Sequence, residues 1–101
     1  MATAQERAHK HEVALVDFEL RLDAWATVLD ARAAEIVAVG AQDHDPYRMR
    51  IATQRRALDD IVVKIRAFRR PTPTVVAWGP FYGDLVASWK ALDSACKELT
   101  S

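Results

Sequence analysis

The fold is decided by residues 13–37, whose sequence is VALVDFELRLDAWATVLDARAAEIV. Within this stretch, aliphatic residues recur every seven positions and aromatic residues fall between them on the same side. The members of this stripe are Leu15, Phe18, Leu22, Trp25, Leu29 and Ile36. Because residues three, four and seven apart share one face of an α-helix, the spacing predicts a long amphipathic helix over about residues 4–39.

Turn residues set the bounds of a second helix. Gly40 ends the first helix, because glycine readily adopts the left-handed conformation found just after a helix. Asp45 and Pro46 favour a second helix over about residues 46–69, since aspartate caps helices and proline suits their first turn. Its expected core stripe is Tyr47, Ile51, Leu58, Ile61, Ile65 and Phe68.

A third helix is expected over about residues 75–99. Its stripe is Tyr82, Leu85, Trp89, Leu92, Cys96 and Leu99. Two starts fit the sequence: Thr74 caps a helix that bends at Gly79 and Pro80, or Gly79 is itself the cap and Pro80 stands in the first turn. Together the stripes predict an all-α fold, a three-helix bundle with a long first helix that forms one domain over residues 1–101.

The composition is typical of a compact, water-soluble domain. Half of the 101 residues are hydrophobic, which is too many for a disordered chain, and the single cysteine, Cys96, excludes an internal disulfide framework. Residues 1–12 are polar and charged, unlike a signal peptide, and no apolar run approaches the roughly 20 residues that span a membrane. We therefore expect a cytoplasmic protein without membrane association.

The first helix carries apolar residues beyond its main stripe. They are Val13, Val16, Leu20, Val28 and Val37. At 1.5 Å per residue this helix is also roughly 54 Å long, against roughly 36 Å for the second, so shorter helices of the same chain do not cover it fully. A helix that is apolar on more than one side is usually buried on more than one side. We therefore predict a homodimer, intertwined or packed, in which two first helices meet; the alternative is a helix that bends or frays at its N-terminus.

Charge is sorted along the chain although the net charge is zero. Residues 1–45 carry four basic and nine acidic side chains, and residues 46–73 carry eight basic and two acidic ones. A basic helix is able to neutralise phosphates, but this one is equally able to pair with acidic residues of the first helix. These are Asp17, Glu19, Asp23, Asp30 and Glu35. Because no nucleic-acid-binding motif is present, we favour ion pairing and do not expect nucleic acid as a partner.

Two segments contain the residue types of metal ligands. Glu6 and His9 have the Glu-x-x-His spacing of carboxylate-bridged metal centres, and residues 43–45 are Asp-His-Asp. A complete centre needs further inward-facing carboxylates, which the second helix offers only at Asp59 and Asp60. We therefore interpret the first segment as a charged helix end and the second as a capping loop, and we predict no metal and no cofactor.

Several short motifs lie near the expected helix boundaries. They are Ala31-Arg32, Val39-Gly40, Asp45-Pro46-Tyr47-Arg48 and Ser88. Over roughly residues 15–92 they resemble the all-helical class of chorismate mutase, whose dimers pack long first helices together. The resemblance implies a site in which Arg32 and Arg48 hold the carboxylates of a small dicarboxylate, with Ser88 also contributing. Arginine suits this role because its guanidinium binds carboxylates in a bidentate manner.

The chain departs from that family at four positions. Where the family has an arginine, a lysine, a glutamate, and a glutamine or glutamate, this chain has Leu15, Gln42 or Asp43, Met49 and Leu92. Without two of the cations, charge complementarity to a dicarboxylate is weaker. We therefore favour a non-catalytic homodimer that acts through protein-protein contacts. The alternatives are a chorismate-mutase-like protein that binds or rearranges a small dicarboxylate, and a nucleic-acid-binding protein, so an isomerase activity stays open.

Overall fold

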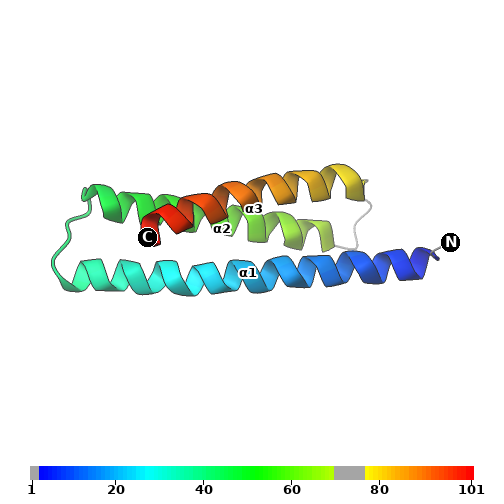
Figure 1. Ribbon diagram of the computed structural model, residues 1–101, viewed down its shortest axis with the longest axis horizontal. Coiled ribbons are helices and arrows are strands. Elements are labelled where there is room, and N and C mark those ends of the chain that lie inside the picture. Colours follow the sequence, from blue (N-terminus) through cyan, green and yellow to red (C-terminus); the bar gives the residue numbers. More distant parts are fainter. Residues whose placement is uncertain (1–2, 70–76) are drawn as a thin grey trace.

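Three helices dominate the part of the chain that the computed structural model describes, residues 3–69 and 77–101. They are α1 (Ala4–Ala38), α2 (Pro46–Arg69) and α3 (Trp78–Thr100). They lie side by side in an elongated bundle, in which α1 and α3 run in the same direction and α2 runs against both (Figure 1). The bundle measures 57 × 24 × 18 Å along its principal axes. The all-α, three-helix prediction is confirmed.

The residues predicted to form the turn between α1 and α2 do so in the structure. α1 ends at Ala38, and Gly40, with a φ of 90°, turns the chain out of the helix. Asp45 caps α2, because its carboxylate accepts hydrogen bonds of 3.0 Å from the backbone N–H groups of Tyr47 and Arg48. This compact turn sets α2 back along α1 in the opposite direction.

The start of α3 differs from both alternatives considered for it. α3 begins at Trp78, and the extended residue Ala77 is its N-cap, without a side-chain hydrogen bond. Gly79 and Pro80 therefore stand inside the first turn, where the missing N–H of proline interrupts no helical hydrogen bond. The other expected cap, Thr74, lies outside the described residues.

The three predicted stripes meet in one core. Its buried members are Leu15, Phe18, Leu22, Leu29, Ile51, Leu58, Ile61, Ile65, Phe81, Leu85, Leu92, Cys96 and Leu99. One prediction is wrong, because Tyr82 is exposed and Phe81 is buried in its place. Phe81 lies about one turn before Leu85, on the same face, and stacks on Phe68 with ring centroids 4.2 Å apart.

Long aromatic side chains connect α1 to α3. Trp25 donates a hydrogen bond of 3.0 Å from Nε1 to Asp93, and the ring of Phe18 meets that of Trp89 edge-on, with centroids 6.3 Å apart. Through these contacts α3 packs against one side of α1, while α2 packs against another.

None of the helices in the described part of the chain has the length and apolar character of a membrane-spanning segment.

Candidate interaction surface on the first helix

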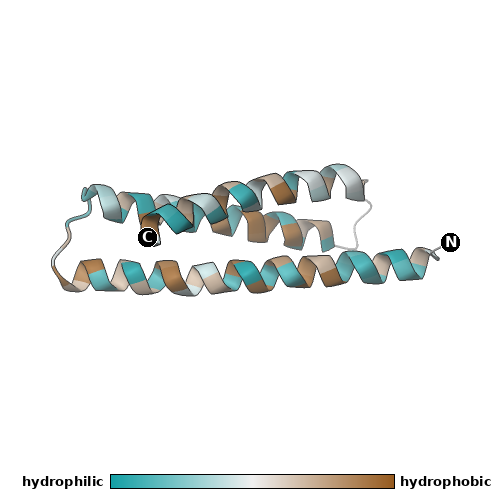
Figure 2. Ribbon diagram, viewed as in Figure 1, coloured by the Kyte–Doolittle hydropathy of each residue, from teal (hydrophilic) through white to brown (hydrophobic). Residues whose placement is uncertain are grey.

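One side of α1 is apolar and yet exposed. Leu20 is 66% exposed, whereas Leu22, two residues further along, is 1% exposed. Most of the exposed large hydrophobic residues in the described chain belong to α1 or its C-cap. These are Val13, Val16, Leu20, Val28, Val37 and Val39. Figure 2 shows hydrophobic residues recurring along α1. The apolar residues that exceed the core stripe therefore stay uncovered by the other helices.

Several of these residues form a continuous ridge. Val16, Leu20, Ala24 and Val28 follow one another at intervals of four, and such a row runs along a helix surface as a ridge that packs between the side chains of a neighbouring helix. Together with Val13, we call them the outer face of α1. Small exposed residues extend this side toward the end of the helix, at Thr27, Ala31, Ala34 and Ala38. The ridge is therefore apolar, with side chains of small to medium size.

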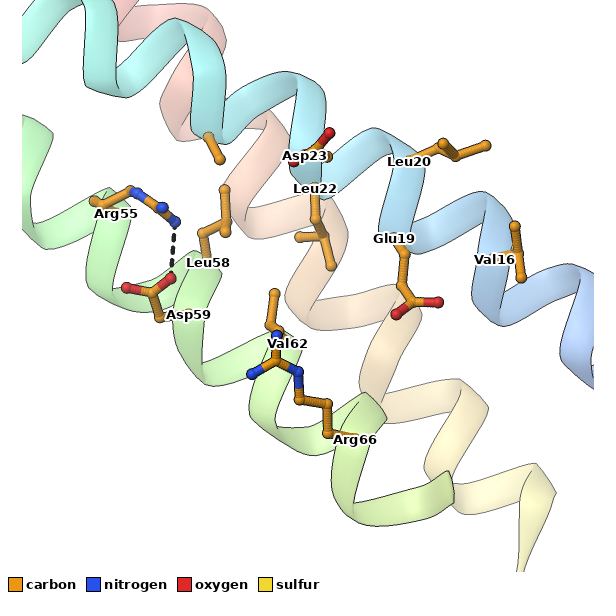
Figure 3. A pocket seen from close by; sticks show the side chains of 11 residues that line it. Val16, Glu19, Leu20, Leu22, Asp23, Arg55, Leu58, Asp59, Val62 and Arg66 are labelled. Atoms are coloured by element: carbon orange, nitrogen blue, oxygen red, sulfur yellow. Dashed lines mark hydrogen bonds and ion pairs between the residues drawn. The ribbon is translucent and has the colours of Figure 1, made fainter. Parts of the chain in front are cut away.

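A groove with a volume of about 540 Å³ follows the seam between α1 and α2 (Figure 3). Its lining residues are Val16, Glu19, Leu20, Leu22, Asp23, Ala26, Arg55, Leu58, Asp59, Val62 and Arg66. Leu22 and Leu58 are buried and form its apolar floor. Val16 and Leu20 belong both to this α1/α2 groove and to the outer face of α1. The groove and the outer face are thus one continuous surface.

Ion pairs cross the seam between α1 and α2 at two places. Arg55 pairs with Asp30 at 3.0 Å. Arg69 bridges Glu12 and Glu19, each at 2.6 Å, and these hydrogen bonds raise the pKa of Arg69 above its usual value. The predicted pairing between the acidic first helix and the basic second helix is confirmed at Asp30 and Glu19.

The remaining acidic residues of that prediction have other partners or none. Asp17 pairs with Arg21 at 2.8 Å, and Glu35 lies 4.0 Å from Arg32, both within α1. No ion pair joins Asp23 to another described residue. The acidic helix is therefore not fully neutralised by the basic helix of its own chain.

Arg66 is the cationic counterpart of Asp23 on the opposite wall of the groove. It too forms no ion pair with the rest of the described chain. In Figure 3 its guanidinium extends along the groove toward Val62, while Asp23 stands on the α1 side. Both side chains are exposed. Among its charged lining residues, the groove thus has one acidic and one basic side chain without an ion pair in the described chain.

The three candidate ligand residues occupy separate contacts in the single chain. Arg48 donates from Nη1 to the carbonyl oxygen of Ala41 at 3.0 Å and pairs with Asp43 at 3.1 Å, so it closes the loop between α1 and α2. Arg32 is exposed near the end of α1. Ser88 lines a shallow depression between α2 and α3. The shared dicarboxylate site that the resemblance implies stays a prediction.

Both segments with metal-ligand residue types are engaged at helix ends. The backbone N–H of Glu6 donates to Thr3 Oγ1 at 3.1 Å, and the N–H of Thr3 donates to the Glu6 carboxylate at 3.3 Å, which forms a capping box. Asp45 caps α2 in the same sense. Within the described ranges, no group of three or more His, Cys, Asp or Glu residues is placed to hold a metal ion. The first segment is therefore a charged helix end, and the second is a capping loop, as the sequence predicts.

No family model, curated protein or solved structure matches this chain. Of the surfaces of this chain, the outer face of α1 and the adjoining groove combine exposed apolar residues, among them Leu20, with an acidic and a basic residue that form no ion pair within the described ranges. We treat this combination as the candidate functional site.

Two features of the packing between helices lie beyond the sequence-based interpretation. The indole of Trp25 donates to Asp93, whose pKa is lowered by hydrogen bonds from Lys97 and then from Trp25. The spacing of Asp93 and Lys97 indicates their pairing, but a single sequence does not indicate a contact between residues 68 positions apart. The sequence also does not indicate that Asp23 and Arg66 line the same groove, because this depends on how α1 and α2 pack.

Proposed function

We propose that this protein is a homodimeric helical-bundle module that acts through protein-protein contacts, and that the outer face of α1 joins two copies. The observation that carries the proposal is the exposure of Val16 and Leu20 on a helix whose opposite face is fully buried. Contiguous exposed apolar surface marks an interaction site in soluble proteins. Covering such a side chain stabilises an assembly by roughly 25 cal/mol for each Å² removed from water.

The closed core supports a packed dimer over an intertwined one. Leu15, Leu22 and Leu29 are buried against α2 and α3 of their own chain, so no core residue needs a helix from a second copy. A two-fold dimer uses the same patch on both copies. The outer face of α1 and the adjoining groove meet this requirement, because the same continuous surface is present on both copies.

Other features support a binding role in place of catalysis. Arg48, one of the two arginines that the resemblance implies for a dicarboxylate site, is held by Ala41 and Asp43 in the loop. The single thiol, Cys96, lies in the core, and burial raises its pKa. A buried free thiol is compatible with a reducing compartment, which supports the proposal of a cytoplasmic module.

Sedimentation equilibrium at micromolar concentration tests the dimer. The wild-type chain is expected at twice its mass of 11.3 kDa. Leu20→Glu is expected to shift the protein toward the monomer, because the contact would bury an unpaired carboxylate.

The matched control is Met49→Glu on α2. Met49 is 54% exposed, against 66% for Leu20, and it lines a depression between α2 and α3, outside both the outer face of α1 and the groove. This variant is expected to keep the mass of the wild type. A wild type that stays monomeric at every concentration contradicts the proposal, and so does equal dissociation of the two variants.

A further inference from the structure

The two helices that border the α1/α2 groove carry opposite net charge. α1 has four basic and seven acidic residues, and α2 has seven basic and two acidic residues. A two-fold axis along the bundle sets α1 beside α2 of the second copy, whereas a two-fold axis across the bundle sets like helices side by side. Because facing like charges oppose association and facing opposite charges favour it, the charges select the axis along the bundle.

We propose that Arg66 of each copy pairs with Asp23 of the other copy, so that the basic α2 lies against the outer face of the acidic α1 across the dimer. This inference rests on the dimer proposed above and names its arrangement. The two residues stand on facing walls of one groove and pair with no described residue of their own chain. A two-fold dimer forms the pair twice.

The geometry of the groove fits this pairing. The 3.0 Å ion pair at Asp30 sets the register of the antiparallel helices α1 and α2, so Asp23 stands about level with Val62. The guanidinium of Arg66 extends toward Val62 (Figure 3). An axis along the bundle keeps every residue at its own level, so Arg66 reaches the level at which Asp23 of the second copy stands. Val16 and Leu20 flank this position, and a pair sheltered from water by apolar side chains interacts more strongly than one in open solvent.

Charge reversal tests the pairing through two variants, Asp23→Arg and Arg66→Glu. Each variant alone sets like charges against one another twice in its homodimer, and its dimer dissociation constant is expected to rise on the order of tenfold. In an equimolar mixture, a heterodimer of the two variants regains opposite charges at both positions. The mixture is therefore expected to associate about as tightly as the wild type. Because both side chains are exposed, circular dichroism is expected to show unchanged helix content in each variant.

The outcomes separate this inference from the dimer itself. If the wild type dimerises and Leu20→Glu dissociates it, but the two charge variants associate like the wild type, the pairing is wrong and the dimer stands. If both variants weaken and the mixture stays equally weak, the two charges act within one chain, which also overturns the pairing. A monomeric wild type overturns both proposals, because a second copy would then not occupy the groove.

Discussion

The two faces of α1 carry similar residues and meet different surroundings. Leu15 and Leu22 on the inner face are buried by α2 and α3, whereas Val16 and Leu20 on the outer face are exposed. Both faces have the spacing that favours an amphipathic helix. Apolar spacing therefore identifies the apolar faces of a helix. Tertiary packing determines which of these faces is buried within the same chain.

The number of helices explains the difference. In a three-helix bundle each helix turns one stripe toward the common core and leaves its far side to solvent or to another molecule. α1 has a second apolar ridge on that far side, and the chain supplies no further helix to cover it among the described residues. The dimer proposed above would cover this second apolar face.

The largest effect that separates the two faces is expected from truncating their leucines. Leu22→Ala removes buried methyl groups and leaves a cavity, so it is expected to lower the free energy of unfolding by about 2–5 kcal/mol. Leu20→Ala removes exposed atoms and is expected to change the stability of the monomer by less than about 0.5 kcal/mol. Urea unfolding, at a concentration low enough to keep the chain monomeric, measures both. Comparable losses in the two variants would erase the distinction between the faces.

A smaller effect is expected at the hydrogen bond that joins α1 to α3. Trp25→Phe removes the N–H that donates to Asp93 and is expected to lower the free energy of unfolding by about 1 kcal/mol. The contribution also depends on pH, because the pKa of Asp93 is lower in the folded chain than in the unfolded one. It is fully present above the unfolded pKa of Asp93 and is lost as pH falls through the folded value.

Trp89→Phe is the control for this hydrogen bond. Trp89 also connects α1 and α3, through its ring contact with Phe18. Unfolding curves across the acidic range are expected to show a pH-dependent loss for Trp25→Phe only. A loss that is the same at every pH would mean that Trp25 contributes through packing and not through the carboxylate.

Much of the fold follows from the sequence, for local reasons. The stripe residues Leu22, Leu58 and Leu92 are buried as predicted, because apolar periodicity marks the side of a helix that faces the core. Gly40 and Asp45 set the turn through their own backbone and side-chain chemistry.

The features that the sequence did not predict depend on tertiary packing between the helices. Phe81 replaces Tyr82 in the core because the packing against Phe68 decides between neighbouring aromatic residues. Of the candidate site, the apolar residues of the outer face follow from the sequence. The alignment of Asp23 with Arg66 does not, since it depends on the register between two helices.

The most direct test of the central claim identifies which atoms of two copies touch. In a mixture of ¹³C-methyl-labelled and unlabelled chains, an isotope-filtered NOE spectrum reports only contacts between copies. We predict cross-peaks from the methyl groups of Leu20 and Val16 in one copy to protons of the other, and none from the methyl group of Met49, which lies on the side of α2 toward α3. A spectrum in which Leu20 and Val16 show no contact between copies, or in which Met49 shows one instead, would contradict the assignment of the outer face of α1 as the surface that joins them.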